Sequence, residues 1–402
     1  MTLEFNKLVE QVAAMGRMLD EVDFNIHDKL AVAMERLYAA TDLDAIHERI
    51  KLVRQSDVSG YRGAAAFDEV IGQPFAPALT PATATIIAGD GSQIYPNEES
   101  PAHYFLLNVG LFTYHHGVDR LPDQRTIPRL YYHKAHVHDR GRVISNRTVD
   151  ARRSVMEMQE LGRAAWETRD EARPLIALYD NRLLFSVGSD VTDSHEIMHG
   201  YFGALTHLYD SQAILAGYLD NPRRSRVVIR LLYLLSLTDE QVRMTDLTTG
   251  GDLEGLHDVD LFAAVLEPGE RSAIMIQNSP KNLAYKQRGD SYEIAFFYLN
   301  VSNSYHTAVA RVDIPMWVAR DKQAVGELHA LLLTQCAMQG RNPYPYALTR
   351  ADELAYVSGK DKAKLDEMIG IELRRKGIDP HRFSAKMWGK ELARAPQRRH
   401  EM

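Results

Sequence analysis

Asp90 stands where its neighbours suggest chemistry rather than a plain surface charge. It follows the β-branched apolar run Ala84–Ala88 and precedes Gly91. A strand that ends on a carboxylate places it where α/β sheets commonly bind ligands, and a glycine lets backbone or ligand approach closely. Asp-Gly is also a common turn dipeptide. The residues alone therefore leave a turn and a functional site both open.

Asp180 interrupts the apolar segment Pro174–Phe185, which predicts a buried strand. A carboxylate in such a strand carries a desolvation penalty unless it is paired or binds a metal ion. The alternative is that Asp180 begins a hairpin with Asn181 and Arg182. Both interpretations stay open at this point.

Glu157 lies on a segment, Val149–Arg169, whose apolar spacing predicts a helix. Arg153 precedes it by one turn, so a surface ion pair is the default interpretation. Glu160 lies one turn further along a similar face. Together with Asp90 and Asp180, the helix glutamate completes an oxygen-only set of the kind that holds Mg²⁺ or Mn²⁺, and two such ions can clamp a phosphodiester.

A competing motif is His195-Glu196-Ile197-Met198-His199, which matches the HExxH pattern of zinc proteases. Such a site needs a third ligand. The extended pattern would require Gly at Phe202 and His at Leu205, and neither is present. A helix face carrying ordinary histidines is therefore the favoured interpretation.

Cations gather late in the chain, as expected of a surface that contacts phosphates. Arg271 opens a predicted strand, and Lys281, Lys286 and Arg288 occupy what the sequence indicates is a loop. The basic tail comprises Arg374, Arg375, Lys376, Arg382, Lys386, Lys390, Arg394, Arg398 and Arg399. A solvated tail is the alternative. No Walker-type glycine-rich loop occurs, so nothing indicates that the chain itself binds ATP.

These residues need a scaffold in which strands alternate with helices. Apolar runs predict strands over 84–90, 103–114, 130–145, 174–185, 213–219, 272–276, 292–301 and 307–314. Helical spacing appears over 149–169, 193–208, 226–236, 323–338, 345–357 and 362–376, and two or three helices precede them over 4–54. The segment 59–81, rich in Gly, Ala and Pro, indicates a connector. This order favours a mixed-sheet α/β domain.

Composition agrees with a globular chain and excludes several classes. The 402 residues are 45% hydrophobic and 25% charged, which excludes a disordered or collagen-like protein. The single cysteine, Cys336, permits no intramolecular disulfide, and the start of the chain lacks a signal-peptide pattern. We therefore expect a cytoplasmic protein without a membrane span. The net charge of −7 leaves room for a local basic groove.

Ordered motifs resemble those of the NurA nuclease family. They are IIAGDGSQIYP, LLNVGLFTY, Arg153-x-x-x-Glu157, PLIALYDNRLL, ILAGYLDNPR, LEPGERSAIM, EIAFFYLNV, ARVDIPMWV and NPYPYALTRADELAYVS. Their shared order over some three hundred residues carries the resemblance. It implies an α/β fold: an RNase H-like mixed β-sheet flanked by helices, with helical N-terminal and C-terminal additions. We expect a helical region over 1–58, a connector over 59–82 and a nuclease domain over 83–402.

The resemblance also implies catalytic metal ligands. Asp90, Glu157 and Asp180 match the family's carboxylates, with Mn²⁺ or Mg²⁺ as cofactor. Asp352 stands where many archaeal members have histidine; an aspartate still ligates a hard cation but removes the histidine's proton-transfer role. Tyr344 and Tyr346 lie in the same motif, where they position DNA or water, or simply pack the helix start.

The function expected from the resemblance is a metal-dependent deoxyribonuclease with single-strand endonuclease and 5′→3′ exonuclease activity. A homodimer would dock on a HerA-type hexameric ATPase in DNA end resection, double-strand break repair or phage defence. Arg271, Lys281, Lys286, Arg288 and Tyr346 would contact DNA. The alternatives are a catalytically weak adaptor on the motor ATPase and, more remotely, the HExxH zinc protease. The N-terminal helices serve dimerisation, ATPase docking or packing on the core.

Overall fold

The computed structural model describes residues 4–55, 60–98, 100, 102–220, 222, 224–245 and 247–378, without the side chains of 17–25. The part of the predicted basic tail that follows Ile378 lies outside these residues. No helix in the described ranges is long and apolar enough to span a membrane.

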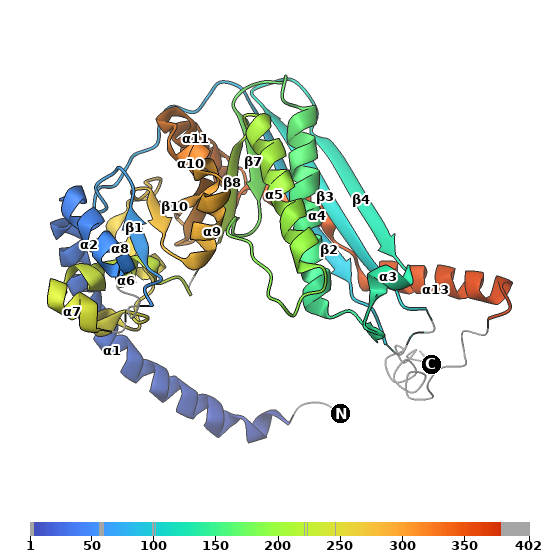
Figure 1. Cartoon of the computed structure of the whole chain (residues 1–402), viewed down its shortest axis with the longest axis horizontal. Coiled ribbons are helices and arrows are strands. Elements are labelled where there is room, and N and C mark those ends of the chain that lie inside the picture. The colour runs from blue at the N-terminus through green and yellow to red at the C-terminus, as the bar shows by residue number, and fades with distance from the viewer. Residues whose placement is uncertain are drawn as a thin grey trace, which may run out of the picture.

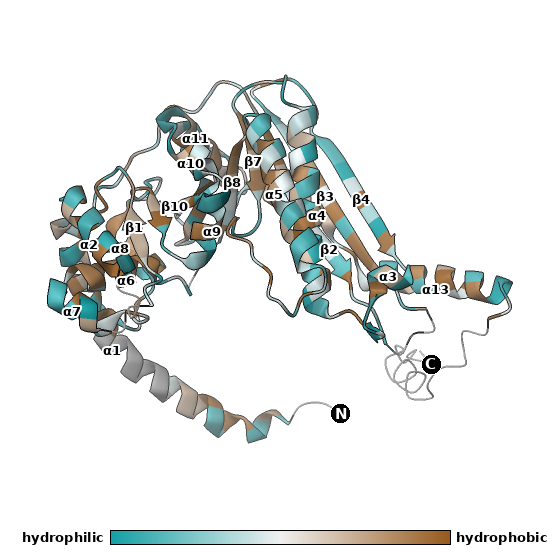
Figure 2. Cartoon of the chain, in the orientation of Figure 1, coloured by the Kyte–Doolittle hydropathy of each residue, from teal (hydrophilic) through white to brown (hydrophobic). Residues whose placement is uncertain are grey.

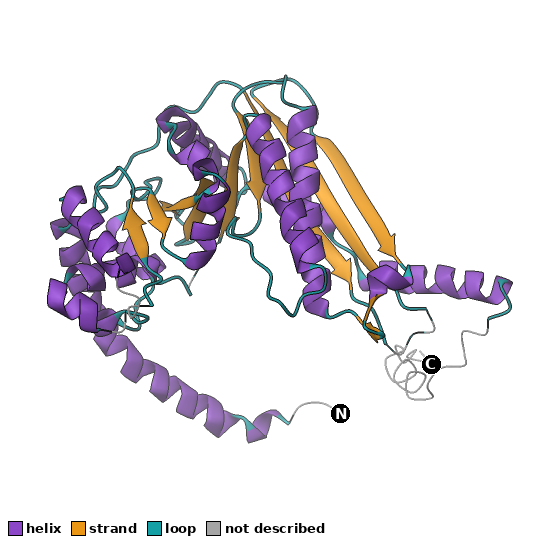
Figure 3. Cartoon of the chain, viewed as in Figure 1, coloured by secondary structure: helices purple, strands orange, loops and turns teal. Residues whose placement is uncertain are grey.

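A nine-stranded sheet forms the centre of the molecule (Figure 1, Figure 3). Its order is β1-β9-β10-β11-β8-β7-β2-β3-β4. The strands are β1 (Ala64–Ala66), β2 (Ala84–Ile94), β3 (Phe105–His116), β4 (Asp123–Tyr131), β7 (Leu175–Tyr179), β8 (Ile214–Leu219), β9 (Met275–Gln277), β10 (Ile294–Asn300) and β11 (Val309–Pro315). A separate small ribbon pairs β5 (His138–Asp139) with β6 (Arg142–Val143).

Half of this sheet has the RNase H-like arrangement that the sequence predicted. Strands β2, β3 and β4 form an antiparallel meander. The chain then crosses through α4 (Asn146–Glu167) to β7, which runs parallel to β2, and through α5 (Ser194–Asp210) to β8, parallel to β7. Every residue of β7 is buried and four of its five are aliphatic, which is typical of a strand covered on both faces. The predicted mixed α/β fold is therefore confirmed.

Helices cover both faces of this sheet (Figure 1). One face carries α4, α5 and α9 (Pro280–Arg288), whose apolar side chains share a buried cluster with β3 and β7. The other carries α10 (Met316–Ala319), α11 (Lys322–Ala337) and α12 (Tyr346–Ala355). In Figure 2 the central strands are brown, while the outer surface of α4 shows teal residues, as expected of an amphipathic helix on a sheet.

The N-terminal helices cover the far end of the sheet. The last turns of α1 (Val9–Ala39) and all of α2 (Leu43–Gln55) bury Ala33, Leu37 and Ile50 against β1 and the helices α6 (Val227–Leu235), α7 (Asp239–Met244) and α8 (Asp258–Val265). Of the roles expected for the N-terminal helices, α2 therefore has the packing role. The first turns of α1 extend away from the body, with Val9, Val12 and Met15 exposed (Figure 1).

Five further helical elements complete the described part of the chain. They are η1 (Phe5–Lys7), α3 (Lys134–Val137), η2 (Gly251–Leu253), η3 (Asp290–Tyr292) and α13 (Gly359–Arg375). Helix α13 buries none of its side chains and extends past β4, the edge strand of the sheet.

Several local predictions were wrong, among them the strands expected over 130–145, where β4 ends at Tyr131 and helix α3 and the two-residue strands β5 and β6 follow. Strand β2 continues past Asp90 to Ile94, so Asp90 lies within the strand rather than at its end. Strand β7 stops at Tyr179, and no hairpin follows Asp180, because the chain proceeds to α5. The cations at 281–288 lie on α9 rather than in a loop, because Ser279 caps a helix that starts with Pro280. Strand β1 lies within the predicted connector and pairs with β9.

Candidate active site

The site forms where β7 ends beside the longer β2. The two strands pair in parallel up to Tyr179 and Gly89, after which β2 continues alone on that side. Asp90 and Asp180 are the next residues on each strand, so they are neighbours in register. Because no strand fills the space beyond Tyr179, side chains from both faces of the sheet can meet there.

Two glycines next to Asp90, one on β2 and one on β3, let a helix approach from each face of the sheet. A Cβ at Gly91 would lie 2.2 Å from Glu157 Oε1, so only glycine leaves room for the α4 glutamate. Gly110 of β3 pairs with Asp90, and a Cβ there would lie 2.4 Å from the Ala351 carbonyl oxygen of α12. Helix α12 therefore rests directly on the sheet and brings Asp352 into hydrogen-bond contact with Asp90.

Asp90 lies at the centre of this group of acids. Burial raises the pKa of its carboxyl to about 7, and the charges of Glu157 and Asp180 and the hydrogen bond with Asp352 act in the same direction. The Gly91 backbone N–H donates to Asp90 Oδ1 at 2.8 Å and opposes the shift. A carboxyl with this pKa titrates near neutral pH, where a bound cation competes with the proton.

Glu157 is buried and incompletely satisfied. Burial raises the pKa of its carboxyl, although Arg153 and the hydrogen bond from Tyr179 oppose the shift. Arg153 Nε lies 3.0 Å from Glu157 Oε1, yet the geometry makes no hydrogen bond, and both atoms are buried without one. A buried carboxylate oxygen left in this state is costly. This Glu157 oxygen is therefore one position at which a divalent cation could bind.

Asp180 is held at the mouth of the same group. Protein around it raises the pKa of its carboxyl although it keeps contact with solvent, and Asp352 and Asp220 add repulsion. The Tyr344 side chain hydrogen-bonds to Asp180 and lowers its pKa in part. Tyr344 therefore orients Asp180 from the segment before α12.

Asp220 is a member of this group that the sequence did not single out. It follows the buried strand β8 directly, as Asp180 follows β7. Burial raises the pKa of Asp220, which His306 opposes. The signal that could have found it was present: ILAGYLD repeats the pattern of an apolar strand followed at once by an aspartate.

The donors suit a hard divalent cation. The group offers only carboxylate and phenolic oxygens, which Mg²⁺ and Mn²⁺ prefer. Across the described residues, no three His, Cys, Asp or Glu side chains are already assembled as a metal shell. The raised pKa values of Asp90, Glu157 and Asp180, together with a Glu157 oxygen that accepts no hydrogen bond, fit a group of acids able to take a cation between them.

Glu160 is not a competitor for this position. Its buried carboxylate accepts from Arg129 at 2.6 Å and from Arg163 at 2.6 Å, so both oxygens are satisfied. Of the two glutamates that the sequence left open, the structure brings Glu157 to Asp90 and Asp180.

The predicted DNA-contacting residues lie in several different settings. Arg271 is buried, donates two 2.9 Å hydrogen bonds to Glu69 and lies over the Phe75 ring. Its guanidinium is therefore part of the core, and we no longer expect it to contact DNA. Lys286 pairs with Glu293 at 2.9 Å, Arg288 lies over the Phe202 ring, and Lys281 is exposed.

Tyr346 packs edge-on against Phe112 and Tyr114, with ring centroids 5.7 Å and 6.2 Å away. This contact matches the alternative in which it packs the helix start.

The HExxH motif forms no site. His195, Glu196 and His199 are exposed on α5, and no group of three metal-ligating side chains contains them in the described part of the chain. Their helix covers the sheet through its apolar face instead.

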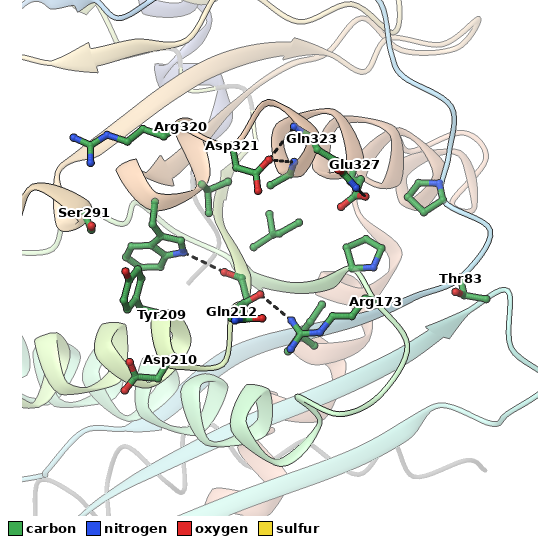
Figure 4. A pocket seen from close by; sticks show the side chains of 18 of the residues that line it. Thr83, Arg173, Tyr209, Asp210, Gln212, Ser291, Arg320, Asp321, Gln323 and Glu327 are labelled. Atoms are coloured by element: carbon green, nitrogen blue, oxygen red, sulfur yellow. Dashed lines mark hydrogen bonds between the residues drawn. The ribbon is translucent and has the colours of Figure 1, made fainter.

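A cavity of about 1110 Å³ lies at the opposite ends of the same strands (Figure 4). It is lined by residues at the starts of β7 and β8, such as Leu175 and Ile214. The Trp317 indole donates to the Ala213 carbonyl and Arg173 donates to Gln212, as the dashed lines show. The carboxylates lie at the other ends of these strands, so this cavity is separate from them.

The NurA domain model matches residues 84–357, a span that contains every carboxylate of the site. The chain belongs to the NurA family. It is therefore a nuclease, as the NurA resemblance predicted.

Curated proteins give no match to this NurA chain. Among solved structures, the catalytic domain of human Endonuclease V is similar, with 14% sequence identity, a TM-score of 0.31, and coverage of 81% of this chain and 95% of that chain. A likeness of this size bears on neither the substrate nor the activity of the NurA chain.

The raised pKa of Asp90 predicts a pH-dependent effect of neutralising it in the metal-free NurA chain. Between about pH 4 and pH 7 the folded carboxyl binds a proton that the unfolded chain releases, so stability falls as pH rises through this window. Asp90→Asn should therefore raise the free energy of unfolding by about 1–3 kcal/mol at pH 8. At pH 4 it should change little.

Thermal unfolding in EDTA at both pH values measures this difference, with Asp119→Asn on the exposed surface as control. An Asp90→Asn variant that is less stable than wild type at pH 8 would contradict the raised pKa of Asp90.

Proposed function

We propose that this NurA chain is a divalent-metal-dependent deoxyribonuclease that hydrolyses phosphodiester bonds of DNA. The convergence of Asp90, Glu157 and Asp180 on the gap beside β2 is the observation that carries the proposal. Single-strand endonuclease and 5′→3′ exonuclease activities are the finer form of this proposal, which the family resemblance supports.

Asp90, Glu157, Asp180 and Asp352 would hold Mn²⁺ or Mg²⁺. When bound, the cation neutralises charge on the scissile phosphate and lowers the pKa of water. The chain's own groups do the positioning. Tyr344 fixes the Asp180 carboxylate, and α12 holds Asp352 against the strand through Gly110.

Arg153 balances the buried charge of Glu157 from one helical turn away. Its Nη1 donates to Gln93 Oε1 at 2.9 Å, which ties the guanidinium to β2. This contact keeps Glu157 facing Gly91 rather than solvent, so the helix ligand is in place before a cation binds.

Asp352 distinguishes this site from one that carries a histidine. A carboxylate at this position adds an oxygen ligand next to Asp90, with which Asp352 makes a hydrogen bond. We therefore assign Asp352 to metal binding.

The two glutamates of α4 give a matched test of the nuclease proposal. Glu157→Gln keeps the shape of the side chain but removes the carboxylate charge that would bind the cation, so DNA cleavage with Mn²⁺ should fall by at least about 100-fold. Glu160→Gln should keep the cleavage rate within a few-fold while lowering the unfolding midpoint, because it breaks ion pairs to a buried acid. Rates on a labelled single strand, with thermal unfolding alongside, measure both.

Equal loss of cleavage in the two variants would contradict the assignment of Glu157. A folded wild-type chain that degrades no DNA with Mn²⁺ or Mg²⁺ would favour the adaptor alternative.

We also propose that the chain works as a homodimer docked on a HerA-type hexameric ATPase in DNA end processing, in repair or in phage defence. The resemblance supports this partnership, and the exposed apolar side chains of early α1, Val9, Val12 and Met15, offer a contact surface.

Deleting residues 1–16 should weaken dimerisation or ATPase binding without lowering the unfolding midpoint, because α2 and the end of α1 stay packed. Light scattering and co-elution with the ATPase measure both associations. A truncated chain that keeps both at wild-type strength would remove α1 from the proposed surface. Deletion of residues 1–59 should destabilise the fold, because it uncovers Ala65 and Ile229.

A further inference from the structure

A second polar cleft lies between α2 and α9, on the side of the sheet away from β4. It has a volume of about 510 Å³ and is lined by Arg54, Arg62, Gln277, Leu283 and Lys286, among others. We call it the α2–α9 cleft. Its only acidic lining residue among the described residues is Glu293, which already pairs with Lys286.

The arginines of this cleft are held by neutral groups. Arg54 Nε donates to the Asn278 side-chain oxygen at 2.8 Å, and Arg62 Nη1 donates to the Tyr61 carbonyl at 3.0 Å. Neither forms an ion pair with a carboxylate in the part of the chain that the structure describes. Two exposed arginines thus line the cleft without a carboxylate partner among the described residues.

Helix α9 adds to the positive potential. Its N-terminus lines the cleft through Ser279, Pro280 and Asn282. The unpaired N–H groups of a helix start favour an anion. This contribution supplements the arginines rather than making a site alone.

Arg182 is a further basic residue next to the carboxylate site. It follows Asp180 by two residues and is half-buried, and its guanidinium makes neither a hydrogen bond nor an ion pair with described residues. Its charge lies near that of Arg311 and near the carboxylates of Asp313 and Asp258.

The contacts of Arg311 connect this position to the cleft. Arg311 donates to Asp313 at 2.7 Å and to Gln277 at 2.9 Å, and Gln277 lines the cleft. Because the Arg182 guanidinium makes no hydrogen bond with described residues, its N–H groups are free to donate to a phosphate.

We propose that Arg182 and the α2–α9 cleft bind successive phosphates of the DNA single strand whose scissile bond lies at Asp90 and Asp180. This inference rests on the proposed nuclease function. It assigns a binding track to cations that lie outside the carboxylate site, and it explains how an acidic chain can hold a polyanion close to its acids. Arginine suits this role because its planar fork binds phosphate oxygens in pairs.

Binding to fluorescein-labelled dT30 in EDTA tests the track without any cleavage. For the full-length double variant R54Q/R62Q, the dissociation constant should rise at least about tenfold, and the slope of log affinity against log salt should shrink by about 1.4, since each single-strand contact contributes about 0.7. Arg182→Gln should shrink the slope by about 0.7. R54K/R62K should restore most of the slope.

Arg320→Gln is the matched control, because Arg320 is exposed at the opposite ends of the strands (Figure 4). It should bind dT30 as wild type does. Wild-type affinity and salt slope in both R54Q/R62Q and Arg182→Gln, with unfolding midpoints unchanged, would overturn the track. Failure of the nuclease proposal is a separate result: wild type would then bind dT30 yet cleave none of it with Mn²⁺.

Discussion

The desolvation and crowding of acids at one gap in the sheet is the constraint on which the rest of this structure depends. Asp90, Glu157 and Asp180 lie in one gap of the sheet, and each has a pKa above its ordinary value. Keeping like charges together costs free energy, which the surrounding apolar packing must offset. The sheet meets this requirement with buried clusters on both faces, and α4 and α12 are fixed by those clusters rather than by the acids.

Backbone geometry then decides which acids meet. The early end of β7 opens the gap, Gly91 admits the α4 glutamate, and Gly110 lets α12 rest on the strand. None of these features carries charge. They explain why carboxylates nearly a hundred residues apart in sequence, such as Asp90 and Asp180, become neighbours, and why Glu160, one turn from Glu157, instead serves an ion-pair network.

Much of the fold could be predicted because apolar periodicity records burial. The strands β2, β3, β7 and β8 and the helix α4 lie where their patterns indicated. The polar strand β4 was largely missed because its residues alternate at an exposed edge, and β1 because three alanines carry no β signal.

The site was predictable in part and for the same reason. Acids that interrupt or follow apolar runs are visible in sequence, which pointed to Asp90 and Asp180, and Asp220 carries the same signal. The pairing of a basic side chain is not visible in the sequence. Arg271 was predicted to contact phosphate, but it pairs with Glu69, some two hundred residues away. Charge patterns alone do not tell a free arginine from a paired one.

The account turns on whether the acids hold a divalent cation, and calorimetric titration of Mn²⁺ into the metal-free chain at pH 8 tests this most directly. The account predicts saturable binding by wild type that weakens at least about tenfold in Asp180→Asn, with a Mn²⁺-induced rise in the unfolding midpoint lost in parallel. Equal Mn²⁺ affinity and equal stabilisation in wild type and Asp180→Asn would contradict it.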